Sequence, residues 1–359
     1  MDFGAIIMSW YTKNKRDLPW RKTRDPYQIW LSEIILQQTR VQQGLPYFFS
    51  FIKKYPDVKS LAEAAEDDIL KLWQGLGYYS RARNLHFAAK TVLADFNGKF
   101  PGSYMELKRL KGVGDYTAAA ISSICYNEVQ AVVDGNVYRV LARIYGIDLP
   151  IDSTEGKKTF AALANELISR KHPADFNQSI MEFGAIQCVP KNPDCGVCPF
   201  ALYCVARKKE LIHILPVKSK KTKVTDRYFN YLVLHHKGNI YLKQRTEKDI
   251  WQGLFDFPLI ETANPVNEKK LIQQKEWKGL FENLKFKIQN YPAEIRHILS
   301  HQRLHVRFVE VELKDKIKGE KGWLYVKEGE LKKYAVPVVI ANYLGYEKRN
   351  QFEKVRKAK

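Results

Sequence analysis

Four cysteines crowded into residues 188–204 constrain this chain more than any other feature. They are Cys188, Cys195, Cys198 and Cys204, in the pattern C-x6-C-x2-C-x5-C. Such crowding is typical of metal binding in a reducing compartment, because a disulfide framework spreads its cysteines along the chain. Four thiolates wrap either a tetrahedral zinc ion or a four-iron cluster, and ligand chemistry alone does not choose between them. Either site would be structural, since four protein ligands leave no open position for a substrate.

Length and charge restrict the partners of the chain. Its 359 residues, 45% hydrophobic and 13% aromatic, supply enough apolar material for two folded domains. The 59 lysines and arginines against 39 aspartates and glutamates give a net charge of +20, which favours a polyanion such as nucleic acid. We find no apolar run of the ~18 residues that a membrane-spanning helix needs, and no export signal in Met1–Arg16. We therefore expect a cytoplasmic protein with no membrane partner.

The spacing of apolar residues divides the chain into parts. Up to Cys204 it predicts helices, one of which begins at Asp25 and Pro26, runs to about Thr39 and is apolar on nearly all sides. Residues 205–227 are basic and poor in apolar residues, which indicates a linker. Residues 228–348 contain strand-like runs and a hairpin turn at Lys237-Gly238, which predict an α+β domain. A basic tail follows at residues 349–359.

Two glycines indicate a site for an anion, and an aspartate downstream of them is a second candidate functional residue. Gly112 and Gly114 lie between two expected helices, where they allow a tight turn and a close approach of backbone N–H groups to an anion. Downstream, Asp134 follows the apolar Val132-Val133 and stands beside the start of another helix. Taken alone, Asp134 is a helix cap and the glycine pair is an ordinary loop.

Together these features resemble the helix-hairpin-helix and Gly/Pro-Asp signature of the base-excision glycosylase superfamily. The cysteine spacing resembles the iron–sulfur loop of DNA glycosylases related to endonuclease III, with a structural zinc knuckle as the alternative. The resemblance implies that Gly112 and Gly114 grip DNA phosphates, that Asp134 faces the sugar, and that the cysteines hold a [4Fe-4S] cluster. Bifunctional relatives carry a lysine in the second hairpin helix to form a Schiff base. This chain has Tyr116 there, which favours simple base release by water.

Three N-terminal segments narrow the resemblance. Leu18-Pro19-Trp20-Arg21, Trp30–Thr39 and Gly75–Leu85 look like the adenine DNA glycosylase family, MutY, and the match runs from about Leu18 to Cys204. That family removes adenine mispaired with 8-oxoguanine. The resemblance implies a monofunctional, monomeric enzyme that acts on double-stranded DNA with adenine opposite 8-oxoguanine or guanine and leaves an abasic site. It also implies a bacterial protein that associates with the nucleoid through DNA.

Glu33 and Asp134 are the expected catalytic pair. Glu33 lies on an apolar helix, where desolvation raises a carboxyl pKa and lets the group hold a proton near neutrality. It would protonate a ring nitrogen of adenine, which the resemblance implies is N7, and ionised Asp134 would stabilise the positive charge that develops on the sugar. The alternative for Glu33 is a buried ion pair with Arg21 or Arg24, which would lower its pKa and remove the acid.

The resemblance assigns roles to further residues. Tyr116 and Asn136 would orient the carboxylates or the attacking water, and Gln178 would read the extruded adenine in a pocket that Arg21 also lines. The residues expected to enter the duplex around the opposite base are Leu36, Gln38, Thr39 and Tyr78. Without the resemblance, those four are ordinary helix and loop packing.

The second domain carries two further resemblances. Ser300 and His301 resemble the family's 8-oxoguanine recognition loop, although Leu299 replaces the phenylalanine that often precedes the pair, and His297 and His305 are alternative readers. The segment Trp251–Pro258 is similar to the start of a Nudix fold, but no Gly-x5-Glu-x7-Arg-Glu-x2-Glu-Glu array for magnesium follows. We expect a reader of damage rather than a nucleotide hydrolase.

The sequence thus predicts a mainly α helix-hairpin-helix glycosylase domain with an iron–sulfur loop at residues 1–204, followed by a C-terminal α+β Nudix-like domain. Two other functions stay open. One is a bifunctional glycosylase and lyase acting on oxidised pyrimidines, which the missing lysine disfavours. The other is a DNA-binding protein without catalysis, whose cluster serves as a scaffold or redox sensor.

Overall fold

The computed structural model describes residues 1–219, 224–317 and 322–346, and the chain divides into two compact units. The first unit comprises Met1–Glu63 and Asn84–Lys221, and the second comprises Ala64–Arg83 and Thr222–Lys359. The segment 64–83, which the sequence prediction includes in the helical domain, lies with the C-terminal unit. The predicted basic tail at 349–359 lies outside the described residues.

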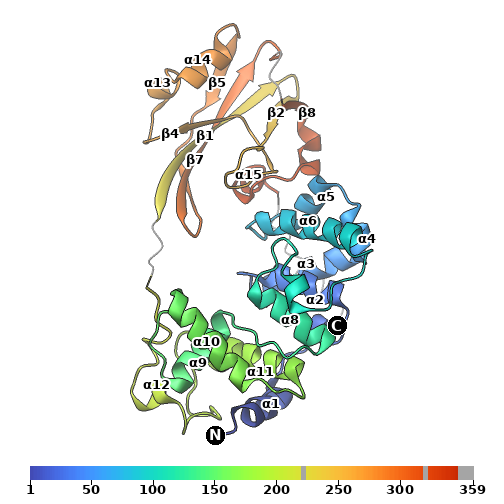
Figure 1. The fold of residues 1–359 in the computed structure, drawn as a ribbon. Helices are drawn as coiled ribbons and strands as arrows, with labels where there is room; N and C mark the ends of the chain where they lie inside the picture. Colours follow the sequence, from blue (N-terminus) through green and yellow to red (C-terminus); the bar gives the residue numbers. More distant parts are fainter. Residues whose placement is uncertain (220–223, 318–321, 347–359) are drawn as a thin grey trace, which may run out of the picture. The chain divides into compact units, whose positions relative to one another are not determined.

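The described part of the first unit is helical, as its apolar spacing predicts (Figure 1). Its helices are α1 (Phe3–Asn14), η1 (Pro19–Arg21), α2 (Pro26–Leu36), α3 (Val41–Lys54), α4 (Val58–Ala62), α7 (Tyr104–Leu107), α8 (Asp115–Tyr126), α9 (Gly135–Tyr145), α10 (Thr154–Leu167), α11 (Pro173–Ile186) and α12 (Val205–Lys208), with most of α6 (Ser80–Asp95). Helices distant in sequence pack together, since α11 contacts α1, α8 and α9, and α2 contacts α8. Segments from both ends of the unit therefore meet around one site.

Helix α2 begins where the sequence predicts and ends earlier. The Asp25 side chain accepts a hydrogen bond from the Tyr27 N–H at 3.0 Å, and Pro26 occupies the first turn. The prediction that the helix continues to about Thr39 is wrong, because it ends at Leu36 and Gln38 adopts a left-handed backbone with φ of 55°. The chain turns sharply there and leaves the Gln38 side chain exposed.

The glycine hairpin joins α7 to α8. Gly112 has a φ of 84°, and a Cβ atom there would lie only 2.9 Å from the Cβ of Asn84, so both conformation and space require glycine. Gly114 is the residue before the first turn of α8, and a Cβ atom on it would meet no atom within 4 Å. The open side at Gly114 leaves the N-terminus of α8 approachable.

The second unit is built on a sheet of eight strands within the described residues (Figure 1). The strands are β1 (Thr225–His236), β2 (Asn239–Gln244), β3 (Phe255–Asp256), β4 (Leu259–Thr262), β5 (Phe286–Asn290), β6 (Ile295–Ile298), β7 (Gln302–Leu313) and β8 (Trp323–Lys327). The helices are α5 (Glu66–Trp73), α13 (Glu268–Leu271), α14 (Lys275–Phe281), η2 (Glu328–Lys333) and α15 (Val338–Tyr343). The predicted hairpin is confirmed, since Lys237 and Gly238 both have positive φ between β1 and β2.

The two long strands β1 and β7 pair in parallel at the centre of the sheet, and both of its faces are covered. On one face, Leu232 and Val309 pack in a cluster with Trp277 of α14. On the other face, Phe308 stacks on Tyr343 of α15 with ring centroids 4.0 Å apart. Coverage on both faces explains why β1 carries a continuous buried run rather than a strict alternation.

None of the helices in the described part of the chain combines the length and the apolar character that crossing a bilayer requires.

Candidate active site

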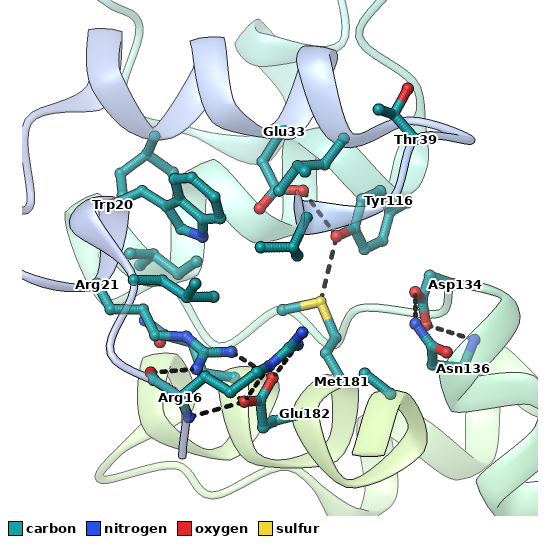
Figure 2. A pocket seen from close by; sticks show the side chains of 17 residues that line it. Arg16, Trp20, Arg21, Glu33, Thr39, Tyr116, Asp134, Asn136, Met181 and Glu182 are labelled. Atoms are coloured by element: carbon teal, nitrogen blue, oxygen red, sulfur yellow. Dashed lines mark hydrogen bonds and ion pairs between the residues drawn. The ribbon is translucent and has the colours of Figure 1, made fainter. Parts of the chain in front are cut away.

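A cavity of about 200 Å³ lies among α2, α8, α11 and the start of α9 in the first unit (Figure 2). The residues predicted from the sequence that line it are Arg21, Glu33, Leu36, Thr39, Tyr116, Asp134, Asn136 and Gln178. Its volume lies below the ~300–1,000 Å³ typical of sites for drug-sized ligands, so it suits a compact ring system. The tertiary structure thus brings together side chains that are up to 157 residues apart in sequence, from Arg21 to Gln178.

Glu33 is buried in the wall that α2 contributes. Its Oε2 accepts a hydrogen bond from the Tyr116 hydroxyl (Figure 2), and the two oxygen atoms are 2.6 Å apart. Burial raises the pKa of Glu33 to about 7; the charge of Asp134 adds to the shift, while the Tyr116 hydrogen bond and the charge of Arg21 oppose it. A carboxyl group with this pKa holds a proton for a substantial part of the time at neutral pH and releases it readily.

Asp134 is both a helix cap and a cavity residue. Its Oδ1 accepts hydrogen bonds from the backbone N–H groups of Asn136 at 2.9 Å and Val137 at 2.8 Å, and its Oδ2 accepts one from the Asn136 amide at 2.8 Å. Burial raises the pKa of this carboxyl, and the three N–H donors oppose that shift. The cap that the sequence offers as the alternative interpretation is present, and it holds the carboxylate at the cavity wall.

A third buried carboxylate faces the cavity from α11. Glu182, whose side chain is 1% exposed, receives hydrogen bonds from the guanidinium groups of both Arg16 and Arg21, each at 2.6 Å to Oε2. Burial by itself would raise the pKa of Glu182, but the hydrogen bonds from Arg16 and Arg21 outweigh it and lower the pKa to about 2. Arg21 is therefore paired with Glu182, and the ion pair between Arg21 and Glu33 considered at the sequence level does not form.

The sequence interpretation missed Glu182, Arg16 and Tyr11. Glu182 stands four residues after Gln178, on the same face of α11 and among apolar neighbours, and this spacing was the available signal. Tyr11 donates a hydrogen bond to Oε1 of Gln178 at 2.8 Å, so the amide Nε2 remains as the donor toward the cavity. No local pattern links Tyr11 to a helix that lies 167 residues further along the chain.

Two predicted DNA-contacting residues lie outside the cavity lining and share an unusual backbone. Gln38 and Tyr78 both adopt the left-handed region, with φ of 55° and 47°, and both side chains are exposed. Residues other than glycine rarely adopt that conformation, and it persists only where the surrounding structure imposes it. Each side chain therefore stands at a sharply turned corner of the chain, Gln38 in the first unit and Tyr78 in the second.

Ser300 and His301 form the turn between β6 and β7 in the second unit. Both are exposed, and the Ser300 hydroxyl lies 3.0 Å from Nδ1 of His301. The turn is closed by a hydrogen bond from the Leu299 N–H to the Gln302 carbonyl at 2.8 Å. The pair is thus presented at the tip of a hairpin, where its donors and acceptors are accessible.

The four clustered cysteines line a small cavity in the first unit, together with apolar residues such as Ile144 and Phe200. Arg143 directs Nη1 at the Cys188 sulfur at 3.4 Å, and the backbone N–H groups of Phe200 and Ala206 face Cys198 and Cys204. Burial raises the pKa values of Cys198 and Cys204, and these donors oppose that shift and favour the thiolate form, so the residues fit a group bound through four sulfurs. Within the described residues, no group of three or more His, Cys, Asp or Glu side chains is arranged to hold a single metal ion.

The helical hairpin, the capped aspartate and the cavity define the class of protein: a helix-hairpin-helix DNA glycosylase. The sequence matches the family described as "HhH-GPD superfamily base excision DNA repair protein" over residues 31–168, and a NUDIX domain over residues 230–346. The adenine DNA glycosylase of Buchnera aphidicola subsp. Schizaphis graminum is 35% identical, covering 85% of this chain and 86% of that protein. The human adenine DNA glycosylase is 32% identical, covering 84% and 65%. The chain belongs to the adenine DNA glycosylase family.

Solved structures agree with the fold of the helical part. A thermostable thymine-DNA glycosylase superposes with a TM-score of 0.54 at 31% identity, covering 58% of this chain and 95% of that chain. An endonuclease III–DNA complex superposes with a TM-score of 0.51 at 20% identity, covering 58% and 94%, which shows the shared fold alone. The predicted helix-hairpin-helix glycosylase domain and Nudix-like domain are confirmed, and the protein is a DNA-binding DNA glycosylase.

Proposed function

We propose that this enzyme hydrolyses the N-glycosidic bond of adenine mispaired with 8-oxoguanine or guanine in duplex DNA. The observation that carries the proposal is that Glu33 and Asp134 line one cavity in contrasting environments. Glu33 is buried with a single hydroxyl donor on Oε2, whereas Asp134 is held by three N–H donors. One carboxyl group is thereby suited to carry a proton and the other to carry a charge.

Glu33 is the general acid of the proposed mechanism. Adenine leaves poorly as an anion, so a proton delivered to N7 allows the bond to the sugar to break. The Tyr116 hydroxyl occupies Oε2 of Glu33, which leaves Oε1 to carry the proton into the cavity. The same hydroxyl also lies 3.2 Å from the Met181 sulfur, and this second contact fixes the ring of Tyr116.

Asp134 stabilises the sugar as positive charge develops on it. Its carboxylate is preorganised by the first turn of α9, so no reorientation is needed when the bond breaks. The Asn136 amide donates to Oδ2 of Asp134, and the Arg139 guanidinium donates to Oδ1 of Asn136 at 2.8 Å, which fixes that amide. Asn136 thus orients Asp134, and water then attacks the sugar and leaves an abasic site.

Gln178 and Arg21 read the base in this proposal. Adenine offers ring nitrogens as acceptors and an exocyclic amino group as a donor. With Oε1 of Gln178 accepting from Tyr11, its Nε2 is available to an adenine ring nitrogen. Arg21 is held at the cavity wall by Glu182.

Simple hydrolysis is favoured over strand cleavage. The 17 residues that line the cavity include two arginines but no lysine, and a lysine amine is what Schiff-base chemistry requires. Tyr116, at the position of the lyase lysine in bifunctional relatives, is fully committed to Glu33 and Met181.

The remaining assignments concern DNA and the cluster. Gly112 and Gly114 would bind DNA phosphates, and Ser300 and His301 would recognise 8-oxoguanine. The residues that would insert into the duplex around the opposite base are Leu36, Gln38, Thr39 and Tyr78. Cys188, Cys195, Cys198 and Cys204 would hold a [4Fe-4S] cluster, which supplies structural cross-linking of residues 188–204 when bound. The protein would act as a monomer at the bacterial nucleoid.

Single-turnover release of free base tests the proposal. Duplexes would carry adenine opposite 8-oxoguanine, guanine, cytosine or thymine, with borohydride added in parallel to trap any Schiff base. We expect rapid adenine release opposite 8-oxoguanine and guanine and no trapped complex. Release that ignores the opposite base would refute the assigned specificity, and a trapped complex would favour the bifunctional alternative.

A further inference from the structure

The corner that carries Tyr78 belongs to the C-terminal unit. The segment Ala64–Arg83 falls inside the helical family match at residues 31–168, yet it packs with the sheet unit. It contains α5, the turn at residues 74–79 and the first residues of α6. The same unit carries the Ser300–His301 turn.

Three polar contacts fasten this segment to the sheet unit. The Arg83 guanidinium donates to the main-chain carbonyl of Gln252 and, at 3.2 Å, to its side-chain oxygen Oε1. Lys71 donates to the carbonyl of Tyr334 at 2.6 Å. Gln244 donates to Asp67 at 3.2 Å. Of these contacts, the one made by Arg83 is nearest to Tyr78 in sequence. Arg83 binds a single partner, Gln252, through two hydrogen bonds.

A glycine allows the loop from the sheet unit to approach α5 closely. Gly253, next to Gln252, has a φ of 86°, and a Cβ atom on it would lie 2.9 Å from Cδ1 of Leu70. Any side chain there would therefore push the loop away from α5 and separate Gln252 from Arg83. The close approach and the two-point grip occur at adjacent residues of one loop.

Within the segment, the side chains of Arg81 and Trp73 support the turn that carries Tyr78. The Arg81 guanidinium lies 5.1 Å from the centre of the Trp73 ring and 5.8 Å from that of the Tyr78 ring, and it donates to the Gly77 carbonyl at 3.2 Å. Trp73 donates to the same carbonyl at 3.1 Å. Arg81 and Arg83 both lie in the first turn of α6. The contact that holds Arg83 in place therefore also holds the Arg81 side chain that supports Tyr78.

We propose that the C-terminal unit positions Tyr78 for insertion into the duplex through the contact between Arg83 and Gln252. Tyr78 then moves as one rigid body with the Ser300–His301 turn. Recognition of the opposite base by this turn is therefore coupled to insertion of the Tyr78 side chain next to that base. Arg83 and Gln252 are positioning residues. The inference rests on the proposed function, which gives Tyr78 its place in the duplex.

A double-mutant cycle tests the inference in the full-length enzyme. On a duplex with adenine opposite 8-oxoguanine, we expect Arg83→Ala to slow single-turnover base release about tenfold. In the Tyr78→Ala background, the same substitution should have no further effect, because the side chain that it positions is gone. Lys333→Ala removes one positive charge from an exposed lysine of the same unit and should leave the rate unchanged. An undiminished effect of Arg83→Ala without Tyr78 would overturn the inference.

Hydrogen exchange of the DNA-free protein gives a readout that does not depend on activity. We expect Arg83→Ala to speed amide exchange in residues 74–83 while the amides of α2 and α11 keep their protection. Arg83→Lys keeps the charge but loses the two-point grip, so it should share the faster exchange. Parent-like exchange in both variants would overturn the inference even if adenine release is confirmed. Faster exchange with no adenine release by the parent would instead locate the failure in the proposed function.

Discussion

Two walls of the same cavity each present a buried glutamate, and the two glutamates differ greatly in acidity. On the α2 wall, burial raises the pKa of Glu33 to about 7. On the α11 wall, Glu182 is also buried, yet the hydrogen bonds from Arg16 and Arg21 overcome burial and bring its pKa to about 2. Burial therefore does not decide the charge of a carboxylate here; the number and charge of the donors do.

The pairing of Arg21 with Glu182 allows Glu33 to remain an acid in a cavity that also contains arginines. Arg21 lines the cavity, and its charge lowers the pKa of Glu33. Because Glu182 accepts two hydrogen bonds from Arg21, the positive charge is compensated on its own wall. Glu33 is left with a neutral hydroxyl as its hydrogen-bond partner from Tyr116. Three substitutions, at Glu33, Glu182 and Tyr116, separate these contributions.

Removing the acidic group of Glu33 should have the largest effect on adenine release. We expect Glu33→Gln to reduce single-turnover adenine release by about 10²–10⁴-fold, the range usual for loss of a general acid. Glu63→Gln, the same change at an exposed site, serves as the control and should match the parent. The parent rate should fall as the pH rises through about 7, since Glu33 must be protonated to act. Equal rates for Glu33→Gln and the parent would show that the α2 wall supplies no proton.

The same substitution should stabilise the fold. The folded-state pKa of Glu33, about 7, lies above the ordinary value of 4.5, so stability is lost as the pH rises from 4.5 through 7. At about 1.4 kcal/mol per pKa unit, the loss in the parent amounts to about 3 kcal/mol. Glu33→Gln carries no titrating group and should unfold with a free energy higher by about that amount at pH 8. Denaturant unfolding at pH 4.5 and pH 8 measures this, and a gain that is equal at both pH values would contradict it.

Removing the charge of Glu182 on the α11 wall should shift the rate–pH profile to lower pH. Glu182→Gln leaves Arg21 without its acidic partner, and the released positive charge should lower the pKa of Glu33 by roughly one unit. The falling limb of the rate–pH profile should move to lower pH, with adenine release near neutrality reduced up to about tenfold. Asp17→Asn, which makes the same charge change at an exposed residue, should not move the limb. A stationary limb in Glu182→Gln would mean that the two walls are independent.

Removing the hydroxyl on the α2 wall should shift the profile in the opposite direction by a smaller amount. The Tyr116 hydrogen bond lowers the pKa of Glu33, so Tyr116→Phe should raise it and move the falling limb to higher pH. We expect the plateau rate to fall only about fivefold, since one neutral hydrogen bond is worth about 1 kcal/mol. A shift to lower pH would indicate that Tyr116 acts on Glu33 by some means other than donating to its carboxylate.

Local features of the sequence were sufficient for several elements. Asp25 and Pro26 mark the start of α2, and Lys237-Gly238 marks the turn between β1 and β2, because caps and tight turns depend on a few adjacent residues. The end of α2 was misplaced by three residues, at Thr39 rather than Leu36. The residues that follow Leu36 are polar, which does not by itself end a helix, and no glycine or proline marks the left-handed Gln38.

The sequence by itself determined the helical and α+β halves, the hairpin glycines, the apolar setting of Glu33 and the capping role of Asp134. These follow from residues within one or two turns of each other. Only the tertiary structure decided that Arg16 and Arg21 meet Glu182, that Tyr11 orients Gln178, and that residues 64–83 pack with the sheet unit. Such pairings join side chains more than 150 residues apart, and they depend on helix packing that no local pattern encodes.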